Sequence, residues 1–188
     1  MDFHMILEIV QYGHPVLRAK GRRIEVVDDK IRELARDMLE TMEEADGVGL
    51  AAQQVGMPLQ LFVVDVRGVS GRESSMWIDG RPVEPGEHMP LVVVNPEIEN
   101  SGKPCLGPEG CLSFPGIQAD IERPSRVHLR ASDLDGNTIN LEAEGLLARA
   151  IQHELDHVRG VLFIDRMSMK DRKRLADELA ELAAAGGG

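Results

Sequence analysis

His153 and His157 stand four residues apart in the segment Ile151–Val158, and Glu154 lies between them. On an α-helix, residues four apart lie one above the other on the same face. Two imidazoles in that arrangement can bind one metal ion, and a carboxylate beside them can accept the proton of a water molecule. The spacing therefore predicts a metal-dependent hydrolase.

The residues around this motif predict an amphipathic helix over about 146–159 that ends before Gly160. At about 100° per residue, one stripe is apolar and can pack in a core. That stripe consists of Leu147, Ile151, Leu155 and Val158. The other side carries the two histidines together with Leu146, Arg149 and Ala150. The alternative interpretation is a buried helix whose histidines are hydrogen-bonded core residues.

Two histidines do not complete a catalytic site, because such sites take three protein ligands and leave one position for water. Downstream of His157 the candidate ligands are all carboxylates: Asp165, Asp171, Asp177, Glu178 and Glu181. Upstream, Cys111 lies among Gly and Pro residues, where backbone N–H groups are free, and a thiolate is a strong, soft ligand. A small buried residue is the alternative for a cysteine, and Cys105 fits that alternative better. The residues alone leave the third ligand open.

A further segment, Gly47–Gly56, holds two glycines followed by two alanines and two amides. Glycine lets a backbone approach a ligand closely. A phosphate-binding loop is the obvious competitor, but the Lys-Ser/Thr pair of such loops does not follow these glycines. Taken alone, the segment is a weak signal for a binding loop.

The composition fits one domain of 188 residues with an aliphatic core, since 43% of the residues are hydrophobic and 3% are aromatic. A net charge of −11 argues against a general nucleic-acid binder, so we expect no DNA partner. We expect no signal peptide and no membrane partner, because the first ten residues lack a basic start and no apolar stretch is long enough. Two cysteines are too few for a disulfide framework, which favours a cytoplasmic protein.

Hydrophobic periodicity and turn residues predict the elements that position these segments. Helices are expected over about 29–45, 146–159 and 169–183. Strands are expected at 61–66, 91–95, 126–131 and 137–142, the last two forming a hairpin. Asp28 is the expected N-cap of the first helix, and Ser168 and Asp171 are spaced as a capping box for the last. The polar stretch 68–90 is expected to be a surface loop or hairpin insertion, and the tail 186–188 to be disordered.

Three of these segments together resemble the motifs of the peptide deformylase family, bacterial type. They read Gly47-Val-Gly-Leu-Ala-Ala-Gln-Gln54, Glu109-Gly-Cys-Leu-Ser113 and Gln152-His-Glu-Leu-Asp-His157, in the family's order. The resemblance implies an α+β catalytic domain over residues 1–167, with antiparallel β-sheets around a central metal-binding helix and an N-terminal helix. Residues 168–188 would form a C-terminal helix and a disordered glycine tail. The departure from the family is the insertion at about 68–90, which puts loop specificity in doubt.

The resemblance also implies a ligand set and a mechanism. Cys111, His153 and His157 would hold one divalent metal, with iron(II) as the working ion and zinc, nickel or cobalt as substitutes. The metal would make hydroxide available at neutral pH, and Glu154 would take up the proton and pass it to the leaving amine. The side-chain amide of Gln54 and the backbone N–H of Leu112 would stabilise the oxyanion.

The implied substrate is the N-formylmethionine of a nascent peptide, which would lose formate in the bacterial cytoplasm. Backbone pairing would come from Val48, Gly49 and Gly110. The methionine pocket would be bordered by His153 and by Leu146, Arg149 and Ala150, with the Arg149 side chain turned outward. The basic run 170–174 predicts either a transient ribosome contact or a solvated helix face. The rival functions are a metallopeptidase with an acidic third ligand and a non-catalytic, metal-stabilised binding module.

Overall fold

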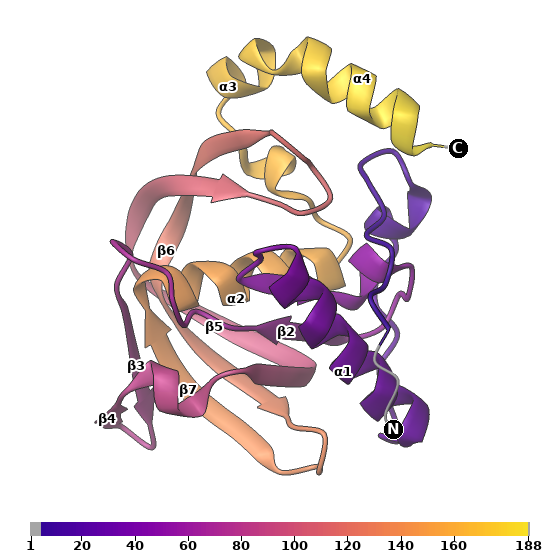
Figure 1. Cartoon of the computed structure of the whole chain (residues 1–188). Helices are drawn as coiled ribbons and strands as arrows, with labels where there is room; N and C mark the ends of the chain where they lie inside the picture. The colour runs from indigo at the N-terminus through magenta and orange to yellow at the C-terminus, as the bar shows by residue number, and fades with distance from the viewer. Residues whose placement is uncertain (1–4, 188) are drawn as a thin grey trace.

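Two long strands form the centre of the fold in the computed structural model, which describes residues 5–187. Strand β5 (Leu91–Gly110) pairs antiparallel with β6 (Gln118–Ser132) along most of its length. The shorter strands are β1 (Gly49–Ala51), β2 (Leu61–Val64), β3 (Ser74–Ile78), β4 (Arg81–Val83) and β7 (Thr138–Glu144). They complete a seven-stranded antiparallel sheet with the order β1-β2-β5-β6-β7-β3-β4, which curves around helix α2 (Figure 1).

Strand β2 is buried on both faces, which explains its uninterrupted apolar sequence. Successive side chains of a strand point to opposite faces. Phe62 and Val64 pack in the core cluster of α2, whereas Leu61 and Val63 pack in the cluster that includes α1 (Asp29–Glu44). The sheet is therefore held between two helices at this point. The predicted first helix is confirmed, and the side chain of Asp28 accepts a hydrogen bond from the Ile31 N–H as the expected N-cap.

Helix α2 (Gly145–Val158) lies in the middle of the molecule, and all of its residues after Gly145 are buried. Its predicted apolar stripe, Leu147, Ile151, Leu155 and Val158, packs in the main core cluster. The helix ends at Val158 with Arg159 as its C-cap, so the predicted range of 146–159 is confirmed within one residue at each end. Among the described residues, none of the helices has the length and hydrophobicity needed to cross a membrane.

The insertion 68–90 contains the hairpin β3–β4, and it is more than a surface appendage. Strand β3 pairs with β7, with Met76 opposite Ala143, and so extends the central sheet. Met76 is buried in the main core cluster. On the same strand, the ring of Trp77 lies 4.5 Å from the guanidinium carbon of Arg126, a cation–π distance. The insertion is thus fixed to the sheet by backbone pairing, burial and an aromatic contact.

The C-terminal segment forms two helices where one was expected, α3 (Met169–Arg174) and α4 (Ala176–Gly186). The chain bends at Leu175, and this bend lets both Leu175 and Leu179 join a buried cluster with Phe163. The Ser168 cap is confirmed, since its hydroxyl accepts a hydrogen bond of 3.0 Å from the Asp171 N–H.

The expectation of a disordered glycine tail is wrong for Gly186. This residue ends α4, and its backbone packs directly against the carbonyl of Tyr12, which leaves no room for a side chain. Gly188 lies outside the described residues, as do the first four residues, on which part of the signal-peptide expectation rests.

We expect Leu61→Ala to lower the free energy of unfolding by about 2–5 kcal/mol, because Leu61 is fully buried between the sheet and α1. The matched control is Leu106→Ala, since Leu106 is 64% exposed, and its change should stay within about 0.5 kcal/mol. Urea unfolding followed by circular dichroism, at equal metal content, measures both. Equal shifts in the two variants would contradict this assignment of the core.

Candidate metal centre and substrate cleft

Three potential metal ligands from two parts of the chain converge beside α2. Cys111 follows the last residue of β5, whereas His153 and His157 lie on consecutive turns of the helix. One ligand atom from each lies within 4.8 Å of the others, and Sγ of Cys111 is 3.2 Å from Nε2 of His157. Within residues 5–187 no other group of three such side chains meets this criterion. One thiolate and two imidazoles are a donor set that fits a divalent transition metal.

Two of the acidic residues that competed as third ligand are engaged elsewhere, and the other three, Asp177, Glu178 and Glu181, are exposed on α4. Asp165 forms an ion pair with Arg18 and accepts a hydrogen bond from the Leu162 N–H. Asp171 caps α3 together with Ser168. Among the described residues, only the upstream Cys111 lies close enough to both histidines to be the third ligand.

A tight turn after β5 places the thiol of Cys111. The Phe114 N–H donates to the carbonyl of Cys111 at 2.8 Å, which closes the turn. The ring of Phe114 stacks on Tyr12 with centroids 4.7 Å apart and meets Phe163 edge to face at 5.1 Å. Such aromatic pairs add stability beyond their buried area, so the turn is anchored in the second core cluster.

A buried carboxylate, Glu109, orients the first histidine. Its Oε2 lies 3.0 Å from Nδ1 of His153. Arg123 donates to both oxygens of Glu109, at 2.6 and 2.8 Å, and Arg149 donates to Oε1 at 2.8 Å. Burial acts to raise the pKa of Glu109, but the hydrogen bonds from Arg123 and His153 hold it well below its usual value. An ionised carboxylate only accepts hydrogen bonds, so Nδ1 of His153 donates and Nε2 is left for a metal.

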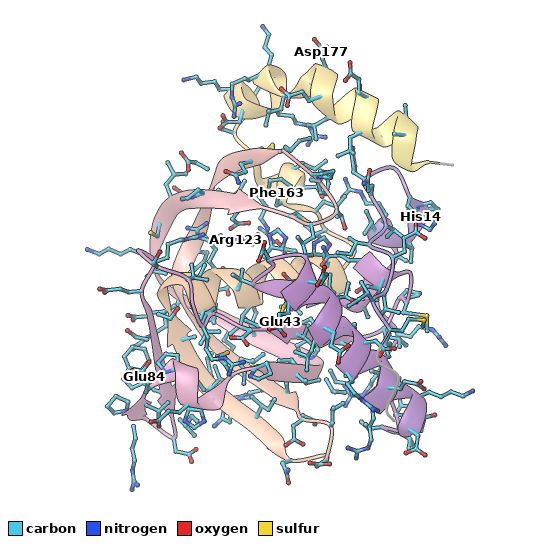
Figure 2. The ribbon with its side chains drawn as sticks, in the orientation of Figure 1. His14, Glu43, Glu84, Arg123, Phe163 and Asp177 are labelled. Atoms are coloured by element: carbon cyan, nitrogen blue, oxygen red, sulfur yellow. The ribbon has the colours of Figure 1, made fainter. Side chains whose placement is uncertain are left out.

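Arg123 links this carboxylate to the rest of the helix. It is 3% exposed and lies in the interior, as Figure 2 shows. Its second contact is a bond of 2.8 Å to Asp156, which also pairs with Arg166 beyond the end of the helix. Glu109 stands in the second motif, but no role was predicted for it. Arg123 lies outside all three motifs, and no spacing pattern in the sequence indicated its role.

The two histidines differ in their affinity for protons. Burial lowers the pKa of His157 well below the usual value, which keeps the ring neutral and able to bind a metal. Burial also opposes protonation of His153, but hydrogen bonds with Cys111 and Glu109 raise its pKa well above the usual value. Protons therefore compete with a metal for His153.

Glu154 faces the centre from the same helix and is 3% exposed. Burial raises its pKa to about 7, because the charged form of a carboxyl is disfavoured away from water. Its Oε2 has no hydrogen-bond partner among the described residues. A side chain at Gly49 would collide with this carboxyl group and would displace it from its present position.

The amide of Gln54 is held in one orientation. Its Oε1 accepts a hydrogen bond of 2.9 Å from the Ala51 N–H, which can only donate. Nε2 is consequently the atom that points to the centre, 3.5 Å from Sγ of Cys111 and 3.3 Å from Oγ of Ser113. The side chain is almost fully buried, so this donor is preorganised.

A cleft of about 400 Å³ opens in front of these groups, within the range of small-molecule sites. All three sequence motifs contribute to its walls. Of the residues expected in catalysis and metal binding, it is lined by Gln54, Cys111, Leu112, His153 and Glu154. The residues expected to contact the peptide also line it: Val48, Gly49, Gly110, Leu146, Arg149 and Ala150. His157 lies behind the cleft wall and is 1% exposed.

Two side-chain expectations for this region are wrong. The Arg149 side chain does not turn outward; it donates to Glu109 and to the carbonyls of Ile121 and Cys105, each at 2.8 Å. A buried carboxylate and strand carbonyls supply the partners that water would otherwise provide. Cys105 is exposed and not packed in a core, because its part of β5 extends past the main core cluster with β6.

Comparisons with known proteins agree with this geometry. Residues 6–173 match the family model described as polypeptide deformylase. A peptide deformylase of Methylacidiphilum infernorum is 48% identical over 178 residues, covering 95% of this chain and 93% of that protein.

Solved structures give the same result. The peptide deformylase of Synechococcus elongatus, in complex with actinonin, has a TM-score of 0.79 at 38% identity. The match covers 96% of this chain and 88% of the Synechococcus chain. The Plasmodium falciparum enzyme has a TM-score of 0.81 at 33% identity, with coverage of 94% and 95%. With three ordered motifs around one Cys-His-His centre, the chain belongs to the polypeptide deformylase family.

Proposed function

We propose that the centre of Cys111, His153 and His157 is where this chain carries out the reaction of its family. The chain is a peptide deformylase, an enzyme that removes the N-formyl group from nascent peptides. The observation that carries the assignment of the reaction to this centre is the meeting of the three ligands with Glu154 and Gln54 in one cleft. Formate and a peptide with a free N-terminal methionine are the products.

The ligand set also limits the ion. A divalent metal bound here supplies a Lewis acid that makes hydroxide available from water at neutral pH. We propose iron(II) as the working ion, with zinc, nickel or cobalt as substitutes, because thiolate and imidazole ligands suit all of these ions. The hydrogen bond from Nδ1 of His153 to Glu109 orients the ring and leaves Nε2 as the nitrogen that would bind the ion.

Glu154 is the general base and then the general acid. It takes the proton from the attacking water and delivers it to the nitrogen of the leaving amine. Burial supports this role by raising its pKa to about 7, so that both protonation states are accessible near neutral pH. The free Oε2 leaves one oxygen available for the transfer.

Gln54 and Leu112 stabilise the negative charge that develops on the formyl oxygen. The Ala51 N–H already holds Oε1 of Gln54, so the Nε2–H group donates without any rotation of the amide. Leu112 follows directly after the ligand Cys111 and also lines the cleft, and its backbone N–H is the second donor that we propose.

The peptide binds along the edge of the sheet. Strand β1 is the first strand in the sheet order, so only one of its edges is paired, and Val48 and Gly49 line the cleft. An extended peptide adds to such an edge by main-chain hydrogen bonds, with Gly110 on its other side. The methionine side chain enters between Leu146 and Ala150, where the stem of Arg149 completes the wall.

We place the enzyme in the bacterial cytoplasm, where formylated chains leave the ribosome. A transient contact with the ribosome would use α3, whose exposed basic side chains include Lys170 and Lys173. This charge is local, since the chain as a whole carries −11.

We expect Glu154→Gln to retain its metal and to lower the rate of formate release from a formyl-Met peptide by about 10²–10⁴-fold. The amide has the size of the carboxyl group but cannot accept the proton. An anaerobic assay with metal analysis of the same sample measures both quantities. Near-normal turnover in this variant would eliminate Glu154 as the base, and a fully loaded wild-type protein that releases no formate would contradict the proposed function.

We expect Cys111→Ser to lose most of its metal at a chelator concentration that leaves the wild type loaded, since a hydroxyl is a much poorer ligand than a thiolate. Cys105→Ser is the matched control, because Cys105 is exposed and outside the centre. Metal content after dialysis against the chelator is the measurement. Equal retention by both variants would place the third ligand elsewhere, as in a metallopeptidase with an acidic ligand.

We expect Glu109→Gln to weaken metal affinity by about 10–100-fold, because the amide orients the His153 ring less strongly than the carboxylate does. Glu122→Gln changes the same charge on the exposed side of β6 and serves as control. Competition with a metal indicator gives the two dissociation constants. An unchanged affinity in Glu109→Gln would show that His153 needs no support from this carboxylate.

A further inference from the structure

Arg72, a cationic residue of the insertion, lies at the border of two hollows. It lines the cleft of the metal centre and also an adjoining hollow of about 250 Å³. The two hollows share Leu146 and Arg149 as well, so the second continues from the wall that we assign to the methionine pocket. Among residues 5–187, no side chain forms a hydrogen bond or ion pair with the Arg72 guanidinium.

The backbone next to Arg72 is tied to the metal-binding helix. The Leu146 N–H donates to the carbonyl of Glu73 at 3.0 Å, and the Leu147 N–H donates to Oγ of Ser74 at 3.0 Å. These are N–H groups of the first turn of α2, which have no partner within the helix. The insertion therefore satisfies the start of α2, and these bonds fix the backbone that carries Arg72 relative to the cleft.

The other two groups of the cleft that can carry a positive charge are already paired. Arg149 and His153 are paired with Glu109. Two further carboxyl groups line the cleft, Asp46, which also borders a separate groove, and Glu154, and neither forms an ion pair with Arg72. Glu73 lines the second hollow but not the cleft. Arg72 is thus the cation of the cleft that remains available to a ligand.

We infer that Arg72 binds a carboxylate in the residues that follow formylmethionine and so favours peptides with Asp or Glu at the second or third position. A guanidinium matches a carboxylate with two parallel hydrogen bonds. A peptide whose methionine enters beside Leu146 carries its next residues past the rim where Arg72 lies. The inference rests on the proposed function, because it takes the Leu146 wall as the methionine pocket.

The test compares matched amidated peptides on the metal-loaded, full-length protein. One pair is formyl-Met-Glu-Ala and formyl-Met-Gln-Ala, and the other is formyl-Met-Ala-Glu and formyl-Met-Ala-Gln. For one pair at least, Arg72→Gln should lower the Glu-to-Gln ratio of kcat/KM by about two- to fivefold, mainly through KM. The wild-type ratio should fall as salt is added, because the pair is exposed. Arg81→Gln, an exposed change in β4 outside both hollows, should keep the wild-type ratio.

The possible results distinguish a failure of the role of Arg72 from a failure of the deformylase function. Equal ratios in the wild type and Arg72→Gln for both pairs would overturn the inference, while turnover of the Gln peptides would still support the deformylase function. A ratio that falls equally in Arg81→Gln would point to net charge and would overturn it too. If the loaded wild type leaves the Gln peptides intact, the proposed function fails and the inference fails with it.

Discussion

The buried carboxylate of Glu109 is the group on which the geometry of the site depends. Removing a charge from water costs several kcal/mol unless partners replace the lost hydration. Glu109 finds them in Arg123 on β6 and in Arg149 and His153 on α2, so the two long strands and the helix are joined at one point. Because Cys111 stands only two residues after Glu109, the same short segment sets both the thiolate and the orientation of the imidazole.

Two carboxyl groups on this site are driven in opposite directions by their surroundings. Glu109 is surrounded by cationic donors, which hold its pKa low despite burial. Glu154 is equally buried but lacks such a partner on Oε2, and burial raises its pKa to about 7. One carboxyl stays charged and supports the ligands, while the other can exchange a proton. The division follows from burial together with the presence or absence of cationic hydrogen-bond donors, as in other enzymes that place two carboxyl groups in one site.

Residue spacing in the sequence predicted the helices and the faces that they present. The helix over 146–159 and its two faces were predictable, because helical spacing separates Leu147 and Ile151 from His153. Local patterns did not predict the third ligand, because Cys111 comes close to the two histidines only when the chain after β5 folds back to α2. The length of β5 was also underestimated, because its Gly- and Pro-containing end has low strand propensity and is held by pairing with β6. The inward turn of Arg149 depends on Glu109 and on strand carbonyls, partners that are distant in sequence.

Strand β1 is only three residues long and has one unpaired edge. A strand edge pairs through main-chain groups, which every polypeptide has. Such pairing therefore depends little on the amino-acid sequence of the bound chain. An unpaired strand edge also invites pairing with a neighbouring molecule, and a longer edge would make self-association a hazard. An edge of three residues limits that hazard, because it offers few main-chain groups to a second copy of the protein.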